Sequence, residues 1–134
     1  MAFDYGTKRI GIAVGQTVSR TATALKVVSA NDGKPKWPEI AVLVEEWAPD
    51  LFVVGMPVYA DQLPNPLGVD IERFSRRLSG RYNRPVEFID ERLSSFAADH
   101  DEEAGARGLD AAAAKIILLT WLELPTVDSS ATSP

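Results

Sequence analysis

Residues 3 to 14 read Phe3-Asp4-Tyr5-Gly6-Thr7-Lys8-Arg9-Ile10-Gly11-Ile12-Ala13-Val14, which predicts a strand, a tight turn and a second strand. Asp4 falls where the first strand ends, and Gly6 lets the backbone turn sharply and come close to a ligand. Lys8 and Arg9 bring two cations within a few residues of that carboxylate. An acid beside glycines and cations suits metal or phosphate chemistry, and few purely structural hairpins need all three together.

The composition is that of one ordinary globular domain. The chain has 134 residues, of which 46% are hydrophobic and 25% charged, so it can bury a core without cross-links. No apolar run approaches the roughly 20 residues of a membrane span, and the sequence opens on strand-like Ala2-Phe3 rather than on a signal peptide. The absence of cysteine excludes disulfides and thiolate metal sites. We therefore expect a cytoplasmic protein with no membrane partner.

Charge is unevenly distributed along the chain. The net charge of -5 argues mildly against nonspecific nucleic-acid binding. Acidic residues gather between positions 39 and 50 and again between 99 and 103, whereas arginines gather between 73 and 84. The sequence therefore predicts one acidic and one basic surface.

Local patterns predict alternating elements. Apolar runs bounded by turn residues predict strands over Ala2–Asp4, Arg9–Val14, Ala22–Ala30, Leu51–Gly55 and Pro85–Ile89. Helical spacing predicts helices over Pro38–Trp47, Gly68–Leu78 and Leu109–Leu122, and another from Ser94 or Ser95 toward Glu103. The remaining segments are expected to be a loop at Met56–Pro66, a flexible link at Gly105–Gly108 and a disordered tail at 125–134.

This order predicts the fold class. Hairpin-linked strands lead into alternating strands and helices, which is typical of an α/β protein with a mixed sheet and helices on both faces. We expect about five strands, the first three antiparallel, in a single domain over residues 1–124. No internal repeat or second domain is expected.

Acidic residues fall at the ends of the predicted elements. Asp4 ends the first strand, Asp90 and Glu91 follow the last strand, and Asp110 begins the final helix. Strand ends at one edge of a sheet converge, and carboxylate oxygens are the ligands that Mg²⁺ and Mn²⁺ prefer. Two such ions about 3.5–4 Å apart can activate a water and stabilise a leaving oxygen in phosphodiester cleavage. The alanines after Asp110 allow its helix to approach the sheet, and so Asp4, closely.

Each acid also has a structural interpretation, and the sequence leaves both open. Asp4 could cap the hairpin turn. Asp110 could complement the macrodipole at a helix start. Asp90 and Glu91 could form a solvated turn in which Arg92 is their ion-pair partner.

Four arginines follow helical spacing in the middle of the chain, and these are Arg73, Arg76, Arg77 and Arg81. Their offsets predict one cationic face, and arginine can bind phosphate oxygens through its forked guanidinium group. The alternative is a solvated helix face that Asp70 and Glu72 partly neutralise. The tryptophans fall at apolar or boundary positions, so we interpret them as packing residues.

Beyond these patterns, the chain resembles the YqgF/RuvX family of bacterial RNase H-like nucleases, whose members are named as Holliday junction resolvase homologues and as pre-16S rRNA processing enzymes. The matching stretches follow the family's order from residue 3 into the final helix. They are residues 3–14, Val53-Val54-Gly55-Met56-Pro57, Asp90-Glu91-Arg92-Leu93-Ser94-Ser95 and Leu109-Asp110-Ala111-Ala112-Ala113-Ala114.

The resemblance implies an RNase H-like sheet and a nuclease that uses Mg²⁺ or Mn²⁺, with two ions. The implied metal ligands are Asp4, Asp90, Glu91 and Asp110. The implied catalytic residues are Asp4, Glu91 and Asp110, with Glu91 slightly favoured over Asp90 as a ligand. The residues implied to hold substrate phosphates are Lys8, Arg9 and Arg92.

The chain departs from the family pattern at three places. Asp61-Gln62 stands where the family has an Asp-Gly pair, and Arg107 is the nearest substitute for a basic residue just ahead of Asp110. Only three residues precede Asp4, where relatives carry several more. A strand that short is expected to lose hydrogen bonds, so either the chain starts upstream of Met1 or the sheet frays.

The leading hypothesis is a metal-dependent endonuclease that acts on structured nucleic acid and processes the 5′ end of pre-16S rRNA in ribosome biogenesis. The alternatives are a Holliday junction resolvase in DNA recombination and repair, or a nucleic-acid-binding module without turnover. The Asp-x-Gly-Thr motif also opens the phosphate hairpin of actin-like ATPases, but 134 residues cannot supply their two lobes. The sequence separates neither RNA from DNA nor a monomer from a weak homodimer.

Overall fold

The computed structural model describes residues 1–56, 66–90 and 105–124, with residue 66 and residues 105–110 described by their backbone alone. The strands in this part of the chain are β1 (Ala2–Asp4), β2 (Arg9–Gln16), β3 (Thr21–Asn31), β4 (Lys34–Pro35), β5 (Phe52–Met56) and β6 (Val86–Asp90). The helices are α1 (Trp37–Trp47), α2 (Pro66–Tyr82) and α4 (Gly105–Glu123).

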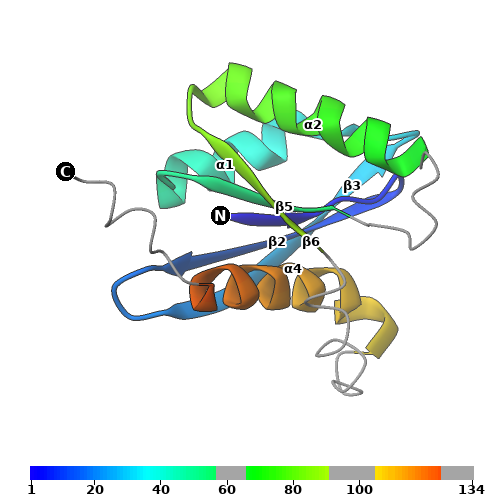
Figure 1. Cartoon of the computed structure of the whole chain (residues 1–134). Helices are drawn as coiled ribbons and strands as arrows, with labels where there is room; N and C mark the ends of the chain where they lie inside the picture. The colour runs from blue at the N-terminus through cyan, green and yellow to red at the C-terminus, as the bar shows by residue number, and fades with distance from the viewer. Residues whose placement is uncertain (57–65, 91–104, 125–134) are drawn as a thin grey trace.

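One mixed sheet organises these elements in the order β4-β3-β2-β1-β5-β6. β1, β2 and β3 are antiparallel neighbours, whereas β1, β5 and β6 run parallel. Helices α1 and α2 cover one face of the sheet and α4 covers the other (Figure 1). Short β1 is therefore central, and it forms hydrogen-bonded pairs on both of its sides.

The two faces of the sheet have separate cores. Phe3 is fully buried beneath α1 and α2, where its ring packs in T-shaped, edge-to-face contacts with the rings of Phe52 and Phe74. Ala2 points to the opposite face and packs with Ala114 of α4. Because side chains alternate along a strand, neighbouring residues of β1 belong to different cores.

The predicted fold class is confirmed, including the three antiparallel strands and helices on both sheet faces. The short strand β4 was not predicted, because two residues carry no periodic signal. Helix α2 extends beyond the predicted Gly68–Leu78 at both ends. The predicted loop at 56–66 and helix toward Glu103 lie largely outside the described residues, and the tail from 125 lies entirely outside them.

The final helix corrects two expectations. The predicted link at Gly105–Gly108 is wrong, because α4 already begins at Gly105. Asp110 therefore lies in the second turn of α4 and not at its start. Two glycines each disfavour a helix by about 1 kcal/mol relative to alanine, but good helix formers follow them and tertiary packing outweighs propensity. None of the described helices is both long and apolar enough to cross a membrane.

Candidate active site

The parallel strands bring two predicted acids to one edge of the sheet. Asp4 is the last residue of β1 and Asp90 is the last residue of β6, with β5 between them. The register pairs Phe3 with Val54 and Val54 with Phe88, so the strands end almost level. Ligands of α/β proteins bind at this carboxyl edge. The predicted convergence is therefore correct for these two residues.

Asp4 lies on the α4 face between two glycines. Ala2, two residues earlier, packs in the α4 core, so alternation places the half-buried Asp4 on the same face. Its partner on β2 is Gly11. Gly55, which follows the partner of Phe3 on β5, stands on the other side. The two neighbouring strand positions therefore place no side chain against the carboxylate.

Asp90 belongs to the opposite face. Ile89 packs in the α4 core and Glu87 accepts a hydrogen bond from Trp121 of α4 at 2.9 Å. Alternation therefore directs Asp90 toward the α2 side, away from the face of Asp4. The structure does not bring the expected pair Asp4 and Asp90 together on one face. Glu91 and Arg92 lie outside the described residues.

Helix α4 runs toward Asp4 from the far end of the sheet. Leu118 and Leu122 lie beside Met1, which precedes β1, whereas Ala114 packs in one core with Ala2 and Ala13. The beginning of α4 therefore extends in the direction in which β1 ends (Figure 1). Position 110 is one turn before Ala114, on the helical stripe that faces the sheet.

The turn after Asp4 is fixed by hydrogen bonds to the β3–β4 connection. The carbonyl of Lys8 accepts from the amide of Ala30 at 2.8 Å, and the carbonyl of Thr7 accepts from the amide of Gly33 at 2.9 Å. A Cβ at Gly6 would lie 2.7 Å from the carbonyl oxygen of Arg9, so only glycine fits there. Lys8 and Arg9 are exposed. The turn holds them at the carboxyl edge of the sheet where Asp4 and Asp90 end their strands, which we call the acid edge.

Tyr5 follows Asp4 at this edge, but its side chain lies on the other face of the sheet, toward α1 and α2. Its hydroxyl donates to the carbonyl of Gly33 at 2.8 Å, and Gly33 adopts φ +81°, a conformation that favours glycine. Burial raises the pKa of Tyr5; nearby Asp70 acts in the same direction, and Arg73 and Arg77 oppose it. Tyr5 therefore connects the end of β1 with α2.

Three of the four arginines of α2 line hollows of the surface. Arg73 and Arg77 line a hollow with Tyr5, and Arg77 and Arg81 line a second hollow farther along the helix. Arg76 is exposed and lines neither hollow; it lies about 60° around the helix from Arg73 and about 140° from Arg81. The predicted four-arginine face stays a prediction for Arg76. Lys34 and Trp37 join the second hollow, which sequence spacing could not reveal because they belong to β4 and α1.

A family model for the RuvX Holliday junction resolvase matches residues 1–124. The chain belongs to this family. The RuvX-family assignment agrees with curated relatives that are provisionally named pre-16S rRNA nucleases. The relative from Hydrogenovibrio crunogenus is 46% identical over 123 residues, covering 92% of each chain. The relative from Pseudomonas putida is 42% identical over 134 residues, covering 94% of this chain and 95% of the relative.

A solved structure supports the fold of this RuvX-family chain. Thermus thermophilus RuvC, in complex with a Holliday junction substrate, superposes with a TM-score of 0.56 over 88% of each chain at 18% identity. The prediction of an RNase H-like fold is confirmed by this match. The sequence predicted a nuclease, that is, a phosphodiester hydrolase that acts on nucleic acid. The family model and the relatives confirm this class of enzyme.

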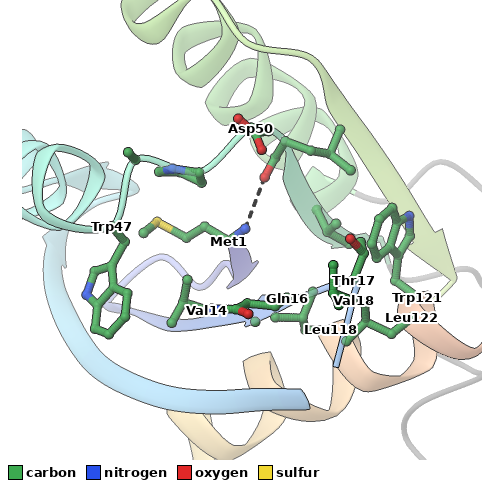
Figure 2. A pocket seen from close by; sticks show the side chains of 15 residues that line it. Met1, Val14, Gln16, Thr17, Val18, Trp47, Asp50, Leu118, Trp121 and Leu122 are labelled. Atoms are coloured by element: carbon green, nitrogen blue, oxygen red, sulfur yellow. Dashed lines mark hydrogen bonds between the residues drawn. The ribbon is translucent and has the colours of Figure 1, made fainter. Parts of the chain in front are cut away.

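Another hollow of the RuvX-family chain lies at the opposite edge of the sheet. It has a volume of about 310 Å³ and opens beside Met1, whose amine donates to the carbonyl of Leu51 at 3.0 Å. Figure 2 shows Trp47 and Trp121 on opposite sides of Met1. This hollow is at the far end of β1 from Asp4, so it is separate from the acid edge.

The metal-binding expectation rests partly on residues beyond the described set. Within residues 1–56, 66–90 and 111–124, no group of three acidic or histidine side chains gathers closely enough to hold a metal ion. Asp4 is one carboxylate at the acid edge, whereas Glu91 and the side chain of Asp110 fall outside that set. Carboxylates at converging strand ends are a donor set that fits Mg²⁺ or Mn²⁺.

Proposed function

We propose that this chain is a divalent-metal-dependent endonuclease and that Asp4, Glu91 and Asp110 are its catalytic acids. The observation that carries the proposal is the position of Asp4 at the carboxyl edge, on the α4 face, with Gly11 and Gly55 beside it. Position 110 is one helical turn before Ala114, which packs in the same core as Ala2 of β1. We therefore propose that β1 and α4 each supply an acid to one site.

Strand parity supports Glu91 over Asp90 as the third acid. Ile89 faces α4 and Asp90 faces the other side. Asp90 therefore does not share the face of Asp4. We propose Glu91, which the family resemblance already favours, as the third ligand, and a supporting position at the edge for Asp90.

Asp4, Glu91 and Asp110 would hold two Mg²⁺ or Mn²⁺ ions. When bound, such ions activate a water and stabilise the leaving oxygen of a phosphodiester. Asp4 contributes a carboxylate on a central, doubly paired strand, so its backbone position is firmly fixed. Lys8, Arg9 and Arg92 hold the substrate phosphates beside these acids, because guanidinium and ammonium groups pair with phosphate oxygens.

The substrate that we propose is the 5′ end of pre-16S rRNA, in the cytoplasm. The supporting observation is the naming of relatives that cover more than nine tenths of this chain at 42 to 46% identity. End processing needs one cut, so a monomer or a weak homodimer suffices. A second candidate is Holliday junction resolution, which the family description favours. That reaction needs two coordinated cuts and hence a stable dimer.

Cleavage of both substrates tests the proposal. A labelled pre-16S rRNA fragment and a four-way DNA junction are incubated with the protein in Mg²⁺ or Mn²⁺. We expect cleavage of the RNA, and a loss of about a hundredfold or more in Asp4→Asn, because a ligand of the metal ions is removed. Glu45→Gln removes an exposed carboxylate of α1 and serves as the matched control.

The possible results separate the candidates. Cutting of the junction alone, by a dimer in a solution mass measurement, would favour the resolvase. Binding without any cleavage would favour a non-catalytic module. Cleavage that is equal in Asp4→Asn and in the parent protein would show that the acid edge is not the active site.

A further inference from the structure

A groove with cationic walls runs along α2, on the sheet face opposite Asp4. Its residues come from three elements, and they are Lys34, Trp37, Arg77, Gly80 and Arg81. We call this the cationic groove. Among the residues that the structure describes, no acidic side chain lines the cationic groove, although the whole chain has a net charge of -5. A positively charged surface on a chain of negative net charge needs a physical reason. Binding of an anionic ligand is one such reason.

The charges of the cationic groove are available to a ligand. Among the described residues, ion pairs join Lys26 to Glu39 at 3.3 Å and Arg73 to Asp70 at 3.5 Å. Within the same part of the chain, Lys34, Arg77 and Arg81 form no ion pair. Arg73 is thus partly neutralised, whereas Arg77 and Arg81 have no ion pair with any described residue.

Aromatic packing fixes one of these charges. The guanidinium carbon of Arg81 lies 4.2 Å from the centre of the Trp37 ring. Trp37 stacks in turn on Phe74, with ring centres 5.6 Å apart and planes inclined by 23°. Phe74 belongs to the core, so this stack ties Arg81 to the body of the protein. A charge held in this way loses less side-chain entropy on binding a phosphate.

Gly80 leaves the floor of the groove open. It lies inside α2, where glycine is about 1 kcal/mol less favourable than alanine. A Cβ built at Gly80 would meet nothing within 4 Å, so no packing within the described residues requires a glycine there. Its position between Arg77 and Arg81 allows a ligand backbone to come close to the helix.

The cationic groove is continuous with the acid edge. A neighbouring hollow shares Lys34, Trp37 and Arg77 with it and extends to Tyr5, the residue after Asp4. The turn that carries Lys8 and Arg9 is hydrogen-bonded to the β3–β4 connection just before Lys34. Asp32 and Asp70 also line this neighbouring hollow, so cations and carboxylates share the path from the edge of the sheet to the cationic groove.

We infer that the cationic groove binds the phosphate backbone of a single-stranded segment that flanks the cleavage site of the substrate. A single row of cations along one helix, with successive arginines about 6 Å apart, matches one nucleic-acid strand better than the two rows of a duplex. The inference rests on the proposed function, since the path leads away from the proposed catalytic acids.

A binding assay without cleavage tests this inference. In EDTA, and in an Asp4→Asn background, the protein is titrated against a fluorescent 12-nucleotide RNA single strand. We expect Arg77→Gln with Arg81→Gln to weaken binding by about tenfold or more. The slope of log affinity against log salt should also fall by about 1.4, because two phosphate contacts are lost. Thermal melting of each variant confirms that it is folded.

The matched control removes two cations elsewhere. Arg20 precedes β3, and the exposed Lys115 belongs to α4, on the other face of the sheet from α2 (Figure 1). Arg20→Gln with Lys115→Gln should change the affinity less than twofold. Equal effects of the two double variants would overturn the inference. So would a 12-base-pair duplex that competes as well as the single strand at equal phosphate concentration. Cleavage is not measured, so this result is independent of the catalytic test.

Discussion

At the scale of single residues, Asp4 and Tyr5 show how one strand end serves two faces. Asp4 faces α4 and the proposed metal site, whereas the adjacent Tyr5 faces α2 and binds the carbonyl of Gly33 at 2.8 Å. Alternation along an extended chain is the cause. Tyr5 therefore holds the β3–β4 connection against the strand that carries Asp4, the proposed catalytic acid.

Replacing Tyr5 by phenylalanine tests this role. Tyr5→Phe should lower the free energy of unfolding by about 0.5–1.5 kcal/mol through the lost hydrogen bond. The pKa of Tyr5 is raised in the folded protein, so the unfolded chain loses its proton first as the pH rises. The stability from this group is complete below about pH 10 and is lost as the pH rises through the folded pKa.

Melting curves between pH 8 and 11, with tyrosinate absorbance, measure both effects. Tyr5→Phe should lose stability less steeply above pH 10 than the parent protein. Tyr82→Phe is a suitable control, because burial raises its pKa too but its hydroxyl does not contact Gly33. An unchanged alkaline slope in Tyr5→Phe would contradict the assigned environment of Tyr5.

At the scale of elements, the distance between α4 and the sheet depends on alanine. Ala114 is fully buried against the sheet in one core with Ala2 and Ala13, which are also fully buried. Small side chains on both surfaces let the helix backbone come close to the strands. That contact sets the position of the helix turn that contains Asp110.

Ala114→Leu should separate α4 from the sheet. Overpacking of a filled core destabilises by about 1–3 kcal/mol. The variant should also lose cleavage activity in excess of its unfolded fraction, because the start of α4 shifts relative to Asp4. Ala112→Leu, two residues away on the opposite side of the helix, is the control. Similar loss of activity in both variants, measured where both are folded, would refute the role of this contact.

At the scale of the whole molecule, charge is divided between the two faces. The net charge is -5, yet the cationic groove carries cations without an ion pair to any described residue, and the opposite face carries the proposed acids. Clustered carboxylates repel one another until a divalent cation binds. Metal binding should therefore stabilise the folded chain as well as enable cleavage.

Mg²⁺ should raise the melting temperature of the parent protein relative to EDTA. At a free concentration ten times the dissociation constant, the gain is about 1.4 kcal/mol in the free energy of unfolding. Asp4→Asn should lose most of this gain, whereas Glu45→Gln should keep it. Thermal melts over a Mg²⁺ series provide the measurement. The same gain in all three proteins would indicate that Mg²⁺ binds elsewhere.

Local patterns in the sequence were enough to predict every described strand except β4, most of the helices and the placement of Asp4 and Asp90 at strand ends. These features depend on periodicity and on turn residues, which act over a few positions. The start of α4 was predicted wrongly, because glycine propensity is a weak local term that packing outweighs.

In contrast, the sheet face on which each side chain lies, and its contacts with residues far away in the sequence, could be read only from the packed fold. The sequence placed Asp4 and Asp90 at one edge, but only the sheet register shows that they face opposite sides. It placed arginines at helical spacing, but only the packing of β4 and α1 against α2 adds Lys34 and Trp37 to Arg77 and Arg81. The physical reason is that these relations join residues far apart in the chain, and burial of the two cores sets them rather than any local preference.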